Sequence, residues 1–236
     1  MNELTNRNTS LNSVTDKKGF EGGIDQGDLI IPRAQLLQAM SPILSLPEYA
    51  GTFKPGMIIN NLTKDVLPPT FVPVFTFTNW IRFNPRNSKD PNYDHAYEPG
   101  SVIYRTNDPY DARLKHDAQF GENGEPPLAI KFLNFFSYFP GQSMPIILSF
   151  SKTSFKAGKT LLSLARFSPG NMFSVRYRLS SRQKETDGNK YFILDVNVDG
   201  KNEGDEYALC EQWHTEFAMK TDKIIVHDEA DATDNV

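Results

Sequence analysis

The run TFVPVFTFTNWIRF, residues 70–83, constrains the fold of this chain more than any other segment. Phe71, Phe75 and Phe77 occupy alternate positions, so an extended chain places them on one face and the intervening residues on the other. Alternation of this length predicts a long β-strand, in which Pro73 favours an edge position or a bulge. The segment therefore indicates a β-rich fold.

Further strands and two helices are predicted along the rest of the chain. Helical spacing of apolar residues predicts two late helices, over 154–167 and 204–220. Residues 84–127 are polar and turn-rich, which indicates long loops. Turn-linked pairs of strands are predicted over residues 129–139, 143–151, 172–181 and 190–198. The pattern favours a mostly β (α+β), barrel-like domain with long loops and two late helices.

Composition divides the chain into three parts. Residues 1–27 are polar and lack periodicity, which predicts a flexible N-terminal arm. Residues 28–221 are expected to form a single domain. Residues 222–236 are expected to form a disordered acidic tail, with Asp228, Glu229, Asp231 and Asp234. The net charge is −4, but residues 29–221 hold 21 Lys/Arg against 19 Asp/Glu, so the placement of charge matters more than its total.

One long stretch contains bases and aromatic rings but no acids. Residues 126–184 carry nine Lys/Arg and ten Phe/Tyr, and neither Asp nor Glu. A surface that binds a polyanion benefits from cations and flat rings without carboxylates, so the pattern predicts a nucleic-acid interface. The predicted base-stacking residues are Trp80, Phe83, Phe132, Phe136, Tyr138 and Tyr177. The predicted phosphate-binding residues are Arg82, Lys131, Lys152, Lys156, Lys159, Arg166, Arg176, Arg178 and Arg182.

These assignments have structural alternatives. Most phenylalanines form the core, so Trp80 and Tyr138, whose polar edges tolerate partial exposure, are the better stacking candidates. Lys152, Lys156 and Lys159 lie at helical spacing and fit a solvated helix face as well as a phosphate track.

No catalytic or metal-binding motif is recognised. GKT at 158–160 lacks the earlier glycine of a phosphate-binding loop, because Thr153 stands there. Cys210 is the only cysteine, and together with His214 it supports neither a zinc site nor a nucleophile. The acids of residues 84–127 leave a metal-dependent nuclease as a minor alternative, although their spacing matches no known motif. We expect no enzymatic activity, no metal and no cofactor.

Two features bear on location. The longest apolar run is far below the ~18 residues needed to span a bilayer. The N-terminal stretch MNELTNRNTSLNSVTDKKG has no hydrophobic signal region. A soluble, cytoplasmic protein without membrane partners is expected.

Several segments resemble a known family. They are DLIIPRAQLLQAMSP, GMIINN, FVPVF…NWIRF, and SFSKTSFKAGKTLLSLARF leading to FSVRYRLSSRQKETDGNKYFILDV. These segments resemble tailed-phage proteins described as single-stranded DNA-binding proteins, over about residues 28–200. The organisation is also similar to that of replicative phage proteins with an OB-fold core and an acidic C-terminus. The resemblance implies an OB-fold-like barrel that coats single strands during replication, recombination or repair in the infected host cell.

The leading hypothesis is a sequence-independent single-stranded DNA-binding protein, which is not an enzyme. Its acidic tail is expected to compete with DNA for the basic surface or to dock replication or recombination proteins. A homo-oligomer is left open. The alternative hypothesis is a virion-associated structural protein or a host-factor-binding protein that does not bind DNA.

Overall fold

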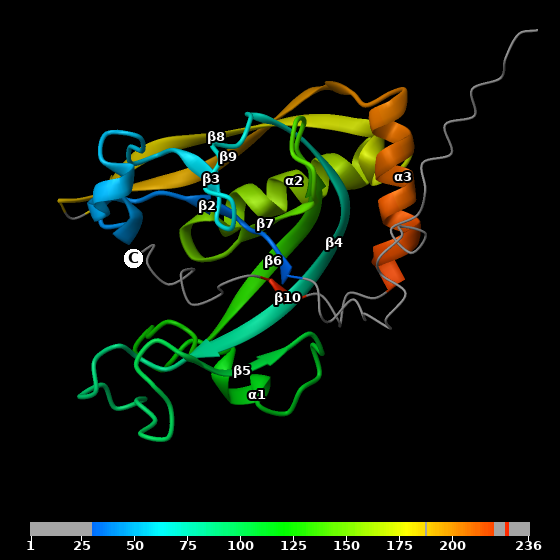
Figure 1. The fold of residues 1–236 in the computed structure, drawn as a ribbon. Helices are drawn as coiled ribbons and strands as arrows, with labels where there is room; N and C mark the ends of the chain where they lie inside the picture. The colour runs from blue at the N-terminus through cyan, green and yellow to red at the C-terminus, as the bar shows by residue number, and fades with distance from the viewer. Residues whose placement is uncertain (1–29, 187, 220–224, 227–236) are drawn as a thin grey trace, which may run out of the picture.

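The computed structural model describes residues 30–186, 188–219 and 225–226. Most of its regular structure is β, as predicted, and the two long helices come late in the chain (Figure 1). In chain order the elements are β1 (Ile30–Ile31), β2 (Ala34–Leu36), η3 (Pro42–Ser45), η4 (Pro47–Tyr49), β3 (Ile58–Asn60), β4 (Thr70–Phe83), β5 (Val102–Thr106), α1 (Leu114–Asp117), β6 (Ala129–Tyr138), β7 (Ile146–Phe150), η5 (Lys152–Ser154), α2 (Phe155–Phe167), η6 (Met172–Ser174), β8 (Val175–Thr186), β9 (Asn189–Lys201), α3 (Asp205–Phe217) and β10 (Ile225–Val226).

The two predicted ends fall largely outside this description. None of the predicted arm, residues 1–27, is described. Of the predicted tail only residues 225–226 are described, as β10, which pairs in parallel with β1. The tail acids Asp228, Glu229, Asp231 and Asp234 lie outside the described residues.

The strand predicted over residues 70–83 is β4, and it forms the centre of the main sheet. The strand order is β7-β6-β4-β8-β9, and β5 pairs with the second half of β4. β6 accompanies β4 along most of its length, whereas β8 pairs with it only at Thr70 and Phe71. The far end of β4 therefore projects away from the two long helices, together with β5 and α1 (Figure 1).

A bulge in β4 changes which of its residues share a face. The register of β4 on β6 shifts between Pro73 and Phe75, where proline cannot donate a ladder hydrogen bond. Phe71 therefore packs in one core cluster, whereas Phe75 and Phe77 pack in the other. The predicted bulge is confirmed, but the prediction that all three phenylalanines share one face is wrong.

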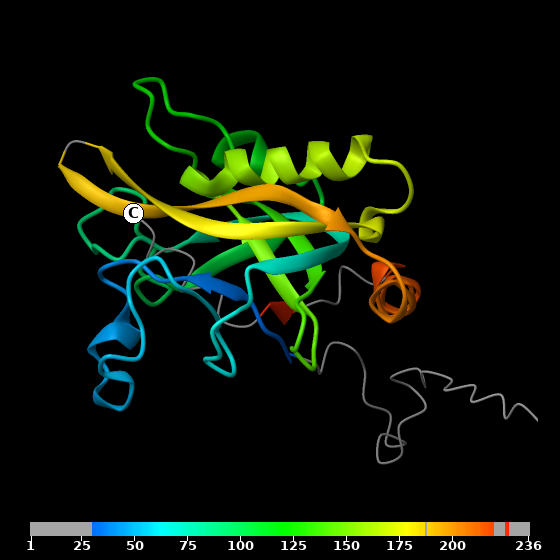
Figure 2. The same cartoon turned by 90° about the horizontal axis from the view of Figure 1, so that it is seen from above.

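Each face of the sheet is covered by one long helix. Leu161 and Ala165 of α2 pack in the cluster that contains Phe135. Trp213 and Phe217 of α3 pack on the opposite face, against the ring of the next residue, Phe136. Figure 2 shows α2 lying along β8 and β9, with α3 nearly end-on. The sheet is thus the middle of three layers.

Among the described residues the sheet does not close into the expected barrel. The β2 segment lies between the two edge strands, and Arg33 forms a parallel bridge with Ile147 of β7. On the other side, Gln38 Nε2 donates to the Phe192 carbonyl at 2.9 Å, and the Phe192 N–H donates to Gln38 Oε1 at 2.8 Å. The contact with β9 is thus made by the side-chain amide of Gln38 and not by the backbone hydrogen bonds that would join two strands of a closed barrel. The predicted mostly β class is confirmed. The sheet is not closed as in the expected OB-fold-like barrel, because its backbone hydrogen bonds are interrupted at Gln38.

Gly158 lies where α2 meets β7. A Cβ atom at this position would stand 2.6 Å from the Cβ atom of Phe150, closer than real contacts allow. Close packing therefore explains the glycine of the GKT triplet without any phosphate.

We predict that Gly158→Ala destabilises the protein. At an exposed position inside a helix, replacing glycine by alanine stabilises a protein by about 1 kcal/mol. Here we expect a loss of about 1–3 kcal/mol, because the added methyl group overlaps Phe150. Urea unfolding measures the difference, and Ser163→Ala on the exposed side of α2 is a control that should change stability by less than about 0.5 kcal/mol. A Gly158→Ala variant more stable than the wild type would contradict the close contact.

Candidate nucleic-acid interface

The exposed face of α2 carries cations and no acids. Lys156, Lys159 and Arg166 are exposed, whereas Leu161 and Ala165 are buried against the sheet. The helix sequence, FKAGKTLLSLARF, contains neither Asp nor Glu. Residues three or four positions apart lie on the same side of a helix, so the three cations form one stripe.

Two further lysines extend the stripe toward β4. Lys152 precedes α2 in the short helix η5. Leu133 of β6 lies opposite Phe150, the last residue of β7, so Lys131 and Lys152 each lie two residues beyond this pair. Lys131 pairs with Trp80 of β4, and its Nζ lies 5.0 Å from the centroid of the Trp80 ring. We call this set the cationic track: Lys131, Lys152, Lys156, Lys159 and Arg166.

Within the described part of the chain, no residue of the cationic track forms an ion pair. Lys131 lies over the Trp80 ring, and Lys159 Nζ lies 5.1 Å from the centroid of the Phe155 ring. Contact with a ring holds an ammonium group in place without neutralising its charge. The track is therefore able to offer its charge to an anionic partner.

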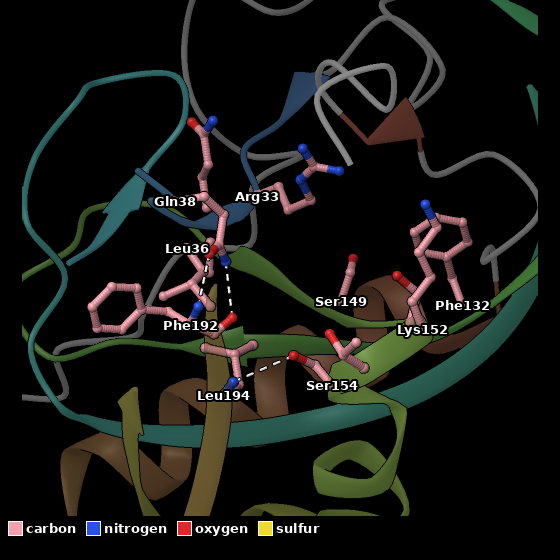
Figure 3. Close-up of a pocket in the computed structure, with 13 residues that line it drawn as sticks. Arg33, Leu36, Gln38, Phe132, Ser149, Lys152, Ser154, Phe192 and Leu194 are labelled. Atoms are coloured by element: carbon pink, nitrogen blue, oxygen red, sulfur yellow. Dashed lines mark hydrogen bonds between the residues drawn. The ribbon is translucent and has the colours of Figure 1, made fainter. Parts of the chain in front are cut away.

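A small pocket opens beside Lys152, between β2, β7 and β9 (Figure 3). Its volume is about 50 Å³, and the described residues that line it include Ser149, Ser151 and Ser154 but neither Asp nor Glu. The backbone of Lys152 has φ 44°, a region that non-glycine residues rarely adopt. Desolvation by the surrounding protein lowers the pKa of the Lys152 ammonium. Hydroxyl groups beside such a lysine suit a small anionic group.

Four of the five arginines predicted to bind phosphates, all except Arg166, are ion-paired with acids from other parts of the fold. Those acids belong to α1, β9 and α3, outside the acid-free segment 126–184. A phosphate would have to displace a carboxylate to reach these arginines, so they are weaker candidates than the cationic track. The pairs are Arg82 with Asp117 at 2.9 Å, Arg176 with Glu206 at 3.5 Å, Arg178 with Asp199 at 3.0 Å and Arg182 with Asp195 at 3.7 Å.

Three of the predicted stacking rings belong to the core. Phe132 is 4% exposed, and Phe136 and Tyr177 are fully buried. A ring packed on all sides has no face to offer to a base. The prediction that these three residues stack on bases is corrected, and their role is packing.

The other three predicted rings are half-buried. Tyr138 packs edge-on against Trp213, and Phe83 packs edge-on against Phe132. The Tyr138 hydroxyl also donates to Glu206 Oε1 at 3.5 Å. Trp80 is the predicted ring that lies directly beside the cationic track.

The exposed rings that were not predicted include Phe167 and Tyr110. Phe167 is 86% exposed and follows Arg166 at the end of α2. Its helical position, four residues after the exposed Ser163, could have revealed it. Tyr110 is 89% exposed and lies in the loop after β5. No local pattern relates Tyr110 to Trp80, because only the sheet brings their segments together.

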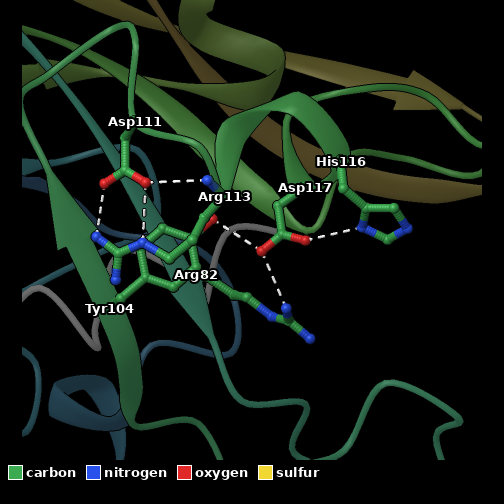
Figure 4. A network of polar contacts seen from close by, with 6 residues as sticks. All are labelled: Arg82, Tyr104, Asp111, Arg113, His116 and Asp117. Carbon is green, nitrogen blue, oxygen red and sulfur yellow. Dashed lines mark hydrogen bonds and ion pairs between the residues drawn. The ribbon is translucent and has the colours of Figure 1, made fainter.

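Asp117 ties α1 to the far end of the sheet (Figure 4). Its carboxylate accepts hydrogen bonds from Arg82 Nη1 at 2.9 Å and Tyr104 Oη at 2.8 Å, and it contacts His116 Nδ1 at 3.0 Å. Burial alone raises the pKa of Asp117, but the hydrogen bonds from His116, Tyr104 and Arg82 outweigh it and lower the pKa. Burial and the bond to Asp117 raise the pKa of Tyr104.

The other groups considered for chemistry lie apart from this surface. Cys210 is buried against the sheet, and burial raises the pKa of its thiol to about 12. In the described ranges, no three His, Cys, Asp or Glu side chains gather as metal ligands would. None of the described helices is long and apolar enough to cross a membrane.

We predict that Asp117 makes stability depend on pH in acid. Because its pKa is lowered by folding, the ionised carboxylate stabilises the protein above the unfolded-state pKa of about 3.9. That contribution is lost as pH falls through the folded-state pKa. Asp117→Asn should cost about 1–3 kcal/mol at pH 7, and the difference from wild type should shrink below about pH 4. Urea unfolding between pH 3 and pH 7 tests this, with the exposed Glu203→Gln as a control. A difference that does not change with pH would contradict the assignment.

Residues 5–223 match the family of Pam3 phage gp34-like proteins. No match is found among curated proteins or solved structures. The matched span includes the whole main sheet, α2, α3 and the cationic track. The protein therefore belongs to the Pam3 phage gp34-like family.

Proposed function

We propose that this protein binds single-stranded DNA without reading its sequence, through the cationic track and the rings at its two ends. One observation carries the proposal. The five cations of the track follow one another from the Trp80 strand to the end of α2, without an ion-pair partner among the described residues. A surface of this kind favours phosphates on electrostatic grounds.

The dimensions of the track suit a strand of several nucleotides. At 1.5 Å per residue, the helical stretch from Lys152 to Arg166 is about 20 Å long. Trp80 lies near one end of the track and the exposed Phe167 at the other. Stacking on such rings contributes about 1–3 kcal/mol per base and accepts any base, because every base has a flat face.

The setting of this activity follows from the family. Membership of a phage family supports a phage setting. In that setting, the proposed role is to coat single strands during phage replication or recombination, in the cytoplasm of the infected host cell. In this proposal the protein is not an enzyme, and its acidic C-terminal residues compete with the strand or dock replication proteins. The alternative, a virion-associated or host-factor-binding protein without DNA binding, fits the family equally well, so binding experiments must separate the two.

We predict that Lys156→Gln/Lys159→Gln weakens binding to a dT oligonucleotide and reduces its dependence on salt. Each phosphate contact on a single strand contributes roughly 0.7 to the slope of log K against log salt, so the slope should fall by about 1.4. Fluorescence anisotropy from 50 to 300 mM NaCl measures both quantities. Arg178→Gln/Arg182→Gln removes the same charge from ion-paired arginines and should change the slope less. If both double variants reduce the salt slope equally, the cationic track is not the DNA-binding site.

We also predict that the strand quenches the fluorescence of Trp80 and not that of Trp213. Trp213 of α3 is buried against the sheet, whereas Trp80 is partly exposed beside Lys131. Titration with a dT oligonucleotide should quench Trp213→Phe as strongly as wild type, and Trp80→Phe should show little quenching. If neither quenching nor a gel shift occurs with any single- or double-stranded nucleic acid, the proposed function is wrong and the structural or interaction-protein alternative takes its place.

A further inference from the structure

A cleft lies beside Trp80, on the side away from Lys131. Trp80 pairs with Lys131 of β6 on one side and with Thr106 of β5 on the other. The chain after β5 folds over this second side and encloses a cleft of about 520 Å³. Its lining includes Trp80, Pro109, Tyr110, Leu114, Lys115 and Gln119.

The walls of the cleft combine flat rings with a polar edge. The Tyr110 side chain is almost fully exposed although its backbone N–H donates to Asp108 Oδ1 at 2.9 Å. Leu114 is buried and closes the cleft with an apolar surface. Lys115 and Gln119 bring an ammonium and an amide, which can donate hydrogen bonds to the edge of a ligand. Pockets that bind small aromatic ligands have this composition.

Two sets of polar contacts hold the outer wall of the cleft against the sheet. Asp117 joins α1 to Arg82 of β4 and Tyr104 of β5 (Figure 4). Arg113 lies over the Tyr104 ring, 4.1 Å from its centroid, and donates to both carboxylate oxygens of Asp111 at 3.0 and 2.6 Å. Asp111 also lines the cleft, but Arg113 balances its charge. These contacts hold the backbone of this wall in place before any ligand arrives, and the Tyr110 ring projects from it as an exposed side chain.

We propose that this cleft holds one unstacked base of the bound strand, between Trp80 and Tyr110, with Lys115 and Gln119 at its edge. This inference rests on the proposed function. The occupant follows from position: Lys131 would bring a strand backbone to the Trp80 ring, which it contacts, and the same ring lines the cleft on the β5 side. A base fills part of the volume and offers a flat face to both rings.

The test compares binding of a dT oligonucleotide with binding of an abasic strand of the same length, which keeps the phosphates but has no bases. Tyr110→Ala should weaken dT binding roughly five- to a hundredfold and leave abasic binding unchanged, because one stacked base is lost. Tyr110→Phe keeps the ring and should bind both strands like wild type. Thermal unfolding of both variants should match wild type, since the Tyr110 side chain is exposed.

Other results overturn the inference in distinguishable ways. If Tyr110→Ala binds dT as wild type does, the cleft holds no base, although the track still binds DNA. If the variant loses dT and abasic binding equally, Tyr110 does not act through a base. If wild type binds neither strand, the proposed function itself fails, and the inference fails with it.

Discussion

Both faces of β4 are buried in its first half, and this requirement shapes the rest of the structure. Every residue from Phe71 to Phe75 is buried, whereas from Thr76 to Arg82 burial alternates. A strand cannot hide both of its faces alone, so a layer is needed on each side, and α2 and α3 supply them. Where this double cover ends, one face of β4 becomes accessible, and Trp80 lies on that face beside Lys131.

The need to cover one face of the sheet also fixes the position of α2. That position decides which lysines stay exposed and, in the described chain, unpaired. Gly158 lets the helix approach Phe150, which turns Lys156 and Lys159 toward solvent. The strand arginines have a different environment, because β9 and α3 bring carboxylates to them. Packing thus divides the basic segment into two classes: the arginines of β8, which are ion-paired, and the cations of the track, which have no ion-pair partner among the described residues.

The elements themselves could be predicted from local pattern. Alternation located β4 to the residue, and helical spacing located α2 and α3 within a few residues, because both patterns arise from neighbours in the chain. The bulge at Pro73 was also predictable, since proline lacks the N–H that a ladder needs. Half of the candidate rings were misassigned: Phe132, Phe136 and Tyr177 look no different in sequence from rings that are exposed.

Local patterns along the chain were enough to predict a β-rich domain with two late helices and a segment whose bases have no acids nearby in the chain. Three features depend on contacts between distant segments: α1, β9 and α3 neutralise four arginines, the sheet does not close at Gln38, and Tyr110 and Trp80 line one cleft. All three have the same cause. Periodicity records which way a residue points within its own element, whereas charge pairing, closure and cavities depend on what distant segments bring to it.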